Sequence, residues 1–327
     1  MRTFYIVAAL LPALLWGCAG GPAVEVSKSN PTRAKRVLEF FYSAEITNVP
    51  RDARDVQIWV PIPQSDENQE ISCVEIRTLE DYDLYTGPLY GNKICHIHVK
   101  GAPQLNIPIS LRFLVTRYED HGGDYPVSPA EMVDQFLKPS RRGAIIPEVE
   151  EAATRIGQRQ DEPQGRIREV YQYVIDNMEY KKEGTGWGHG DTVWACSARY
   201  GNCTDYHALF IALSQALGVP AHFDMGFPLP PDKSEGTIGG YHCWAHFYLS
   251  EMGWVPVDVS EADKRPALKN YFFGSHDPNR VKFTTGRDII LEPRQKGEPL
   301  NYFIYPYAEV DGIPHREMTL SFKFRDL

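Results

Sequence analysis

The sequence predicts an α+β fold, in which an antiparallel β-sandwich precedes a domain of helices packed on an antiparallel sheet. Three observations lead to this prediction. Hydrophobic residues alternate with residues of the opposite face through residues 36–119, as they do in strands. Apolar residues then recur at intervals of three and four between residues 128 and 217, which is the spacing of helices. Alternation returns after residue 241, so in the second domain helices come first and a sheet follows.

Length and composition set the number of domains and exclude one class of partner. The chain has 327 residues, which allows two domains at roughly 100–200 residues each. Hydrophobic residues make up 43% of the chain, enough to form packed cores. Lys and Arg number 34 against 43 Asp and Glu, so the net charge is −9. Since phosphate neutralisation needs clustered basic residues, we expect no nucleic-acid partner.

The N-terminus has the features of an export signal. Arg2 precedes an apolar stretch over residues 4–16, the layout of a secretory signal with a short hydrophobic region. The segment Leu15-Trp16-Gly17-Cys18 resembles a bacterial lipobox, in which Cys18 would carry the lipid. Residues 1–18 are therefore expected to direct export to the bacterial periplasm, with a lipid anchor on the membrane. An ordinary signal peptide and a buried N-terminal helix are the alternatives. The small and polar residues 19–35 predict a flexible tether.

The β-domain is expected over residues 36–122. Alternation is clearest at residues 56–60 and 107–115, and no helical stretch interrupts it. Turn sequences separate the strands, among them Asn48-Val49-Pro50 and Tyr90-Gly91-Asn92. Short strands with regular turns favour an antiparallel sandwich.

The second domain is expected over residues 123–327. Ser128 and Glu131 are expected to form a capping box, with Pro129 at the first helical position. Two amphipathic helices follow, one with its apolar face at residues 167–178 and one that begins near Cys203 and ends at Gly218. Strands are predicted over residues 242–249 and 254–259, and the remainder is mixed strand and loop.

Cysteine usage points to a free thiol. The chain has six cysteines, and removal of Cys18 leaves five, an odd number for an oxidising compartment. Cys73 and Cys95 both lie in the β-domain and are a possible disulfide pair. Cys243 is expected to be buried or to be bonded to Cys196.

Cys203 lies where the backbone favours the thiolate. It begins a helix, and the unpaired N–H groups of a helix N-terminus stabilise a negative charge. The thiolate is the nucleophilic form, so the position suits covalent catalysis. Taken alone, the position favours a buried structural cysteine, so it is a weak signal for catalysis.

His242 and Asp258 supply the partners that a thiolate nucleophile needs. An imidazole holds the thiolate and protonates the leaving group, and a carboxylate orients the imidazole. Residues of equal parity share a strand face, so Asp258 joins the face of His242 only if it lies opposite an even-numbered residue such as Trp244. A four-residue hairpin loop would place Asp258 on the wrong face. We therefore predict a loop of three or five residues, or a bulge, between the two strands.

Four motifs in order resemble the transglutaminase-like core of the papain-fold cysteine enzymes, over about residues 165–262. They are Gly201-Asn202-Cys203-Thr204-Asp205, Gly218-Val219-Pro220-Ala221, His242-Cys243-Trp244 and Gly253-Trp254-Val255-Pro256-Val257-Asp258. The resemblance implies that Cys203 is the nucleophile, His242 the general acid and base, and Asp258 the orienting carboxylate. It implies no metal and no cofactor. The oxyanion would be stabilised by the Cys203 N–H and one further donor. Trp194 lies in the loop just before the nucleophile, so its indole N–H is a candidate for this donor; alternatively, Trp194 is a core aromatic residue that anchors the loop.

Three functional classes remain open on these residues. The favoured one is an exported cysteine enzyme that transfers or hydrolyses acyl groups of peptide or protein amides through a thioester. The second is a catalytically silent binding or scaffolding module of the cell envelope. The third is a zinc site whose spacings do not match a closed structural site, built from Cys196, Cys203, His242, Cys243 and His246. Three further histidines near these motifs are also candidates. His207 and His246 are expected to be packing residues, and His189 is expected to lie in a flexible Gly-rich loop.

Overall fold

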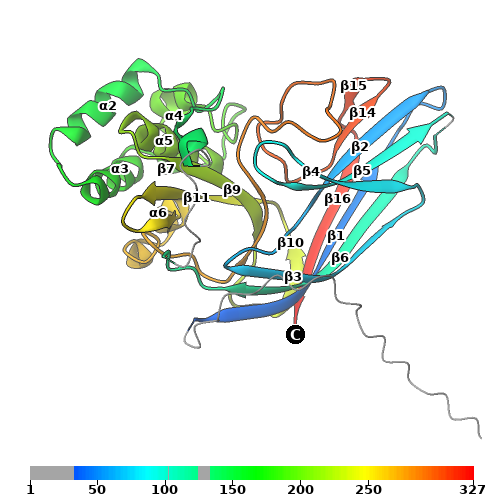
Figure 1. Ribbon diagram of the computed structural model, residues 1–327, viewed down its shortest axis with the longest axis horizontal. Coiled ribbons are helices and arrows are strands. Elements are labelled where there is room, and N and C mark those ends of the chain that lie inside the picture. The colour runs from blue at the N-terminus through cyan, green and yellow to red at the C-terminus, as the bar shows by residue number, and fades with distance from the viewer. Residues whose placement is uncertain (1–32, 102, 124–132) are drawn as a thin grey trace, which may run out of the picture.

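The computed structural model describes residues 33–101, 103–123 and 133–327 (Figure 1). The expected signal, the lipidated Cys18, most of the tether and the Ser128–Glu131 capping box lie outside the described residues. Within the described ranges, no helix is long and apolar enough to cross a membrane.

The sandwich consists of two five-stranded antiparallel sheets, as the alternation predicts. The strand order of the first sheet is β10 (Glu235–Ile238), β16 (Met318–Asp326), β1 (Lys35–Ile46), β6 (Ile107–Tyr118), β3 (Gln69–Thr78). The strand order of the second is β15 (Ile313–His315), β14 (Tyr307–Val310), β2 (Asp55–Ile62), β5 (Lys93–Lys100), β4 (Tyr82–Thr86).

Strands from the C-terminal part of the chain complete both sandwich sheets. β16 pairs with β1 along its whole length, from Leu38 opposite Asp326 to Ile46 opposite Met318, and β14 pairs with β2. In Figure 1 the red β16 accordingly lies beside the blue β1. The sheets therefore extend across the boundary that the sequence analysis drew at residue 122, because strand pairing joins segments that periodicity alone cannot relate.

The second half of the structure is a four-stranded antiparallel sheet with helices packed on it. The strand order is β12 (Gly253–Val257), β11 (His242–Leu249), β9 (Ala221–Pro228), β13 (Arg280–Thr285). The helices are α2 (Pro147–Gly157), α3 (Pro163–Asn177), α4 (Thr192–Ala198), α5 (Cys203–Ala216) and α6 (Val259–Lys264). Shorter elements are η1 (Gln135–Leu137), η2 (Pro266–Leu268) and the parallel pair β7 (Glu179–Tyr180) and β8 (Tyr200–Gly201).

Helix α5 is the centre of this half. It is buried from Cys203 to Gln215, and it contacts β11 and β9 on one side and α2, α3 and α4 on others. A helix that is apolar all round is expected in such a position. Its end matches the sequence prediction, since Gly218 adopts a positive φ of 75° just beyond the last turn. The predicted α+β fold is confirmed.

Aromatic side chains join the sandwich to the core sheet. Phe227 on β9 packs against Phe40 on β1 with ring centroids 5.4 Å apart, and against Phe322 on β16 at 4.4 Å. All three rings are buried, and they belong to one continuous hydrophobic core. Pairs of this kind contribute about 0.5–1.5 kcal/mol beyond the area that they bury.

The expected Cys73–Cys95 disulfide is wrong. Cys95 is a free thiol, buried on β5 of the second sheet, whereas Cys73 lies on β3 of the first. Both members of the other pair considered, Cys196 and Cys243, are free as well. Of the two expectations for Cys243, burial is the correct one.

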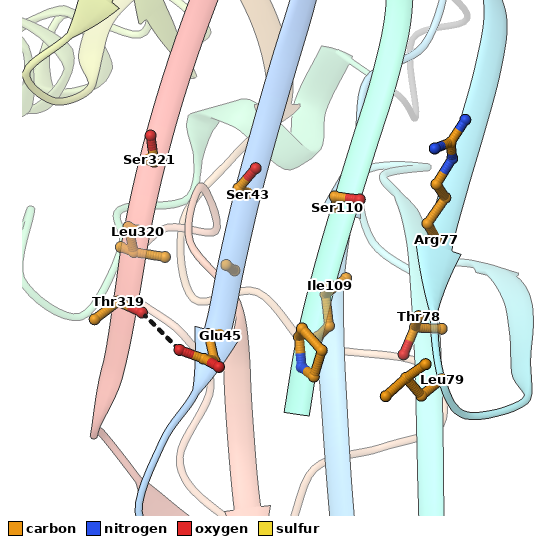
Figure 2. A pocket seen from close by; sticks show the side chains of 12 residues that line it. Ser43, Glu45, Arg77, Thr78, Leu79, Ile109, Ser110, Thr319, Leu320 and Ser321 are labelled. Carbon is orange, nitrogen blue, oxygen red and sulfur yellow. Dashed lines mark hydrogen bonds between the residues drawn. The ribbon is translucent and has the colours of Figure 1, made fainter. Parts of the chain in front are cut away.

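A hollow of about 450 Å³ lies over β16, β1, β6 and β3 (Figure 2). Its lining is mostly hydroxyl and aliphatic side chains, with Glu45 and Arg77 as the charged ones. Within it, Thr319 donates a hydrogen bond to Glu45 at 3.5 Å. No cysteine or histidine lines this hollow, so the chemistry must be sought around α5.

Candidate active site

The thiol of Cys203 is positioned by a capping box at the start of α5. The Asn202 side chain accepts a hydrogen bond from the Thr204 N–H at 2.9 Å, and the Asp205 carboxylate accepts one from the Asn202 N–H at 3.0 Å. Cys203 is the first helical residue, and its own N–H has no acceptor among the described residues. A donor free at the helix N-terminus can stabilise a negative charge.

The hairpin between β11 and β12 has the geometry that the sequence predicts. Leu249 lies opposite Gly253, so three residues form the loop. The last ladder pair is Ala245 with Val257, and the next position in this register brings Asp258 opposite Trp244. Asp258 therefore shares the face of His242, and its Oδ2 lies 2.7 Å from His242 Nε2.

Asp258 is held by four hydrogen bonds in a fully buried position. It caps α6, where its Oδ1 accepts from the Glu261 N–H at 3.0 Å and from the Ser260 hydroxyl at 3.1 Å. Its Oδ2 accepts from Arg280 at 3.1 Å in addition to His242. Burial raises the pKa of this carboxyl, but the charges of His242 and Arg280 lower it well below its usual range. Asp258 is therefore ionised and cannot rotate freely.

The pKa shifts of Cys203 and His242 favour an ion pair between the two side chains. Burial raises the pKa of the Cys203 thiol, but hydrogen bonds from Cys243 and His242 and the charge on His242 lower it well below its usual value. Burial lowers the pKa of His242, and the charge and hydrogen bond of Asp258 together with the Cys203 thiolate raise it to about 10. Because His242 Nε2 faces Asp258, Nδ1 is the ring nitrogen left for the sulfur. These shifts favour a thiolate at Cys203 and an imidazolium at His242.

His207 and Cys243 lie beside Cys203 and His242, but neither is placed to act as the catalytic base. The Val259 N–H donates to His207 Nε2 at 3.1 Å, so the ring carries its proton on Nδ1 and donates it to the Cys203 carbonyl at 2.8 Å. Both ring nitrogens are therefore occupied, which fits the expectation of a packing residue. The Cys243 sulfur lies 3.7 Å from His207 Nδ1, on the side of β11 opposite to His242.

Tyr241 is a residue of the site that the sequence analysis missed. Its hydroxyl accepts a hydrogen bond from the Asn202 amide at 3.1 Å and shares one with the Thr204 hydroxyl at 2.8 Å. These two residues flank Cys203, while Tyr241 itself precedes His242. The hydroxyl therefore ties the nucleophile's helix to the strand that carries the imidazole. Its position directly before His242 is the signal that could have identified it.

The expectation for Trp194 is wrong. Its indole N–H donates to the Tyr200 carbonyl at 2.9 Å, and its ring packs edge-on against Tyr200 at 5.3 Å. The indole N–H is therefore bonded to a carbonyl of its own loop and is not available to an oxyanion at Cys203. Trp194 anchors the loop before the nucleophile, which was the alternative for this residue.

The Gly-rich loop around His189 is clamped rather than flexible. From inside, the Asp205 carboxylate accepts hydrogen bonds from the Gly188 N–H at 2.6 Å and the Gly190 N–H at 2.9 Å. From outside, Arg287 donates to the carbonyls of His189 at 3.0 Å and Gly190 at 2.9 Å. Arg287 comes from the C-terminal part of the chain, so that part shapes the site.

We expect Asp205→Asn to destabilise the protein. The carboxylate accepts from three backbone N–H groups, and an amide would offer one oxygen and turn its own N–H₂ group toward a donor. A buried donor without a partner costs about 1–3 kcal/mol, so the free energy of unfolding should fall by roughly 2 kcal/mol in urea titrations. Asp191→Asn is the matched control, because Asn caps a helix as well as Asp does. Equal effects of the two substitutions would contradict this account.

The five residues of the zinc site considered from the sequence do not form a group with the spacing of metal ligands. Among the described residues, two groups have the spacing for a metal ion, and neither includes Cys196, Cys203, Cys243 or His242. His246 belongs to both groups, together with Asp120, His276, His222 and Asp224. His246 therefore lies in a separate buried cluster.

Comparisons with known proteins find a family match and a relative along most of the chain. A family model described as the Transglutaminase-like superfamily matches residues 150–259, the segment that carries Cys203, His242 and Asp258. An uncharacterized protein of Haemophilus influenzae is 25% identical over 345 residues, covering 92% of this chain and 93% of that protein.

Two solved structures are also similar. One, described as a candidate cysteine protease from Cytophaga hutchinsonii, superimposes with a TM-score of 0.60 at 16% identity over 90% of this chain and 93% of that chain. The other is the periplasmic domain of TgpA from Pseudomonas aeruginosa, with a TM-score of 0.36 at 16% identity over 68% of this chain and 74% of that chain. The first of these shows that the fold is shared over nearly the whole chain.

Proposed function

Because residues 150–259 form a domain of the transglutaminase-like superfamily, we propose that this protein is a cysteine enzyme acting on peptide or protein amides. Cys203 serves as the nucleophile, His242 as the general acid and base, and Asp258 as the group that orients His242. The observation that carries the proposal is the buried Asp258 carboxylate, which is held by Arg280 and lies 2.7 Å from His242. The charge and hydrogen bonding of His242 in turn lower the pKa of the Cys203 thiol. Such a chain has the roles and geometry of a nucleophile–base–acid triad.

The reaction proceeds by acyl transfer. The Cys203 thiolate attacks the amide carbonyl carbon, and a bond from sulfur to carbon forms. His242 gives its proton to the amide nitrogen as the carbon–nitrogen bond breaks, which releases an amine and leaves a thioester. Neutral His242 then takes a proton from water or from a second amine, which attacks the thioester. The carbon–sulfur bond breaks and the thiolate and imidazolium are restored.

The backbone N–H of Cys203 is available for the oxyanion. It lies at the N-terminus of a buried helix, where the helix dipole adds to the hydrogen bond. A single donor of this type is worth about 10²- to 10³-fold in rate.

The reaction type is tested with a mixed peptide library incubated with and without an added primary amine. Mass spectrometry of the products reports cleavage, deamidation or amine incorporation, with the Cys203→Ala protein as the blank. We expect at least one of these modifications from the wild type and none from the variant. Products that are identical in the two samples would instead favour the silent binding module.

We also propose that the protein is exported and carries a lipid on Cys18, on the basis of the lipobox-like segment. Metabolic labelling with a fatty-acid analogue, followed by fractionation of the envelope, tests this. Label in the membrane fraction is expected for the wild type and should be absent from Cys18→Ser. An unlabelled wild-type protein would refute the lipid anchor.

A further inference from the structure

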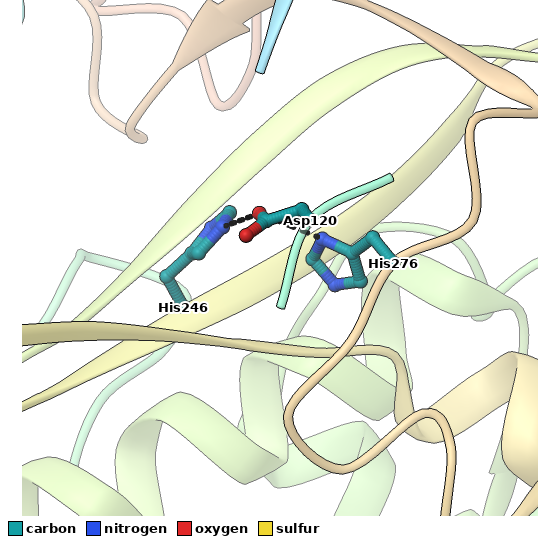
Figure 3. Close-up of side chains that lie close together, drawn as sticks. All are labelled: Asp120, His246 and His276. Carbon is teal, nitrogen blue, oxygen red and sulfur yellow. Dashed lines mark hydrogen bonds and ion pairs between the residues drawn. The ribbon is translucent and has the colours of Figure 1, made fainter. Parts of the chain in front are cut away.

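A second buried cluster of polar side chains lies away from the thiol. Asp120, His246 and His276 converge from three separate segments: the chain just after β6, the middle of β11, and the loop before β13 (Figure 3). Their exposures are 1%, 4% and 0%. None of the three takes part in the proposed acyl transfer, so the cluster requires another explanation.

The backbone fixes two of these three residues against each other. The Asp120 N–H donates to the His276 carbonyl at 2.9 Å, and the His276 N–H donates to the Asp120 carbonyl at 2.8 Å. This bridge joins the end of a sandwich strand to a loop of the core. The Asp120 carboxylate is oriented further by the Gly122 N–H, which donates to Oδ1 at 2.9 Å. Its other oxygen, Oδ2, therefore faces the two imidazoles.

The donor atoms have the separation of metal ligands. Asp120 Oδ2 lies 3.2 Å from His246 Nε2 and 3.8 Å from His276 Nδ1, and all three atoms lie within 4.8 Å of one another. Ligands at 2.0–2.2 Å from a tetrahedral zinc ion are themselves roughly 3.4 Å apart. The observed distances bracket that value, so small side-chain rotations suffice to bring the three atoms onto one ion.

The other ring nitrogen of His246 lies beside a carboxylate, as it does in many metal-bound histidines. His246 Nδ1 lies 3.0 Å from Asp224 Oδ2, and Asp224 is itself held by the Thr285 hydroxyl at 2.5 Å. A carboxylate on the second nitrogen fixes the tautomer of a ligating imidazole and raises its basicity.

His276 is the independent observation that points to a ligand. It is fully buried, and neither of its ring nitrogens has a hydrogen-bond partner among the residues that the structure describes. Burying an imidazole without a hydrogen-bond partner lowers the stability of the folded protein, so buried polar side chains normally have one. Its Nδ1 is directed at the Asp120 carboxylate across 3.8 Å, a gap that a metal ion would close.

We propose that Asp120, His246 and His276 bind a divalent transition-metal ion, with Zn²⁺ as the best match to two imidazoles and one carboxylate. The family resemblance implies no metal, and the sequence gives no sign of this site, because Asp120 and His276 lie 126 and 30 residues from His246 and form no motif with it. The ion clamps the end of β6 to the core sheet and so stabilises the contact between the two halves of the protein.

The neighbouring group of His222, Asp224 and His246 is the competing site. In that group His246 would bind the ion through Nδ1, whereas in the first group it binds through Nε2 and its Nδ1 faces Asp224. His246 Nδ1 cannot serve as a metal ligand and as the partner of Asp224 at the same time. The first group is favoured because it gives the unpartnered His276 a function and leaves Asp224 as the supporting carboxylate.

Metal analysis of the whole chain tests the proposal. The protein is made as Cys203→Ala, so that the thiol cannot bind zinc, stripped with a chelator and dialysed against micromolar Zn²⁺. About one Zn²⁺ per chain is expected, together with a rise in unfolding temperature that grows with Zn²⁺ concentration. No bound zinc and no shift would overturn the proposal.

Two matched variants locate the ion. His276→Leu should no longer bind one Zn²⁺ per chain and should show no rise in unfolding temperature with Zn²⁺. Because a ligand is removed, its affinity for zinc should fall by more than the roughly 10- to 100-fold that loss of a supporting carboxylate costs. Since it replaces an unpartnered buried ring with an apolar side chain, it should fold without metal. His222→Leu should keep both. Zinc retained by His276→Leu but lost by His222→Leu would refute this site in favour of the neighbouring one.

Discussion

Cys203→Ala is expected to lower the turnover of any amide substrate by about 10⁴-fold or more. The substitution removes the atom that forms the thioester, and no other group can take its place, since His242 only moves protons. The Cys203 side chain is 2% exposed and small, so the variant should fold, and thermal unfolding should show one cooperative transition as in the wild type. Initial rates on the substrate found in the peptide library measure the effect.

Cys196→Ala is the control for this prediction. Cys196 is a free, half-buried thiol on α4, and burial raises its pKa instead of lowering it. Its removal should leave turnover within a factor of about two. If Cys196→Ala lost activity and Cys203→Ala kept it, the nucleophile would have been assigned to the wrong helix.

Asp258→Asn is expected to reduce turnover by about 10³- to 10⁴-fold and to destabilise the fold. An amide can turn its N–H₂ group to His242 Nε2, which favours the wrong tautomer and leaves the imidazolium without its counter-charge. The same change deprives buried Arg280 of a carboxylate 3.1 Å away. Removal of one partner of a buried ion pair costs about 3–5 kcal/mol, which urea titration would measure.

The loss of stability should depend on pH in a defined direction. The folded pKa of Asp258 is lowered, so its contribution is complete above the ordinary carboxyl pKa of about 4 and is lost as the pH falls through the folded value. The difference in free energy of unfolding between the wild type and Asp258→Asn should therefore become smaller in acid. Asp263→Asn, on the same helix, is the control and should keep full activity, because its partner Tyr206 donates to it and can donate to an amide oxygen. If the difference in free energy of unfolding between the wild type and Asp258→Asn instead grew in acid, Asp258 could not be ionised in the folded protein.

The local features of the site could be predicted from the sequence because each has a short-range cause. The start of α5 follows from its capping residues, and the strand face of Asp258 follows from parity and loop length. The three-residue loop brings Asp258 onto the face of His242, as the parity argument requires. In these cases the residues that determine the geometry lie within about twenty positions of one another.

The features that escaped prediction depend on contacts between distant segments. Arg280 reaches Asp258 from another strand, and Arg287 clamps the loop at His189 from nearly a hundred residues away. The indole of Trp194 was misassigned because its donor satisfies a carbonyl six residues along the chain, a choice that only the loop conformation decides. Strand periodicity likewise cannot show that β16 pairs with β1.

The charge state of the Cys203 sulfur is the centre of the account, and titration of its thiolate absorbance measures it directly. The ultraviolet difference between wild type and Cys203→Ala, followed from acid to about pH 10, cancels the tyrosines and the other thiols. With the pKa of His242 raised to about 10 and that of Cys203 held well below its ordinary value of about 8.5, the difference should already be fully developed at neutral pH. A difference that develops only near pH 8.5 would mean that no ion pair exists.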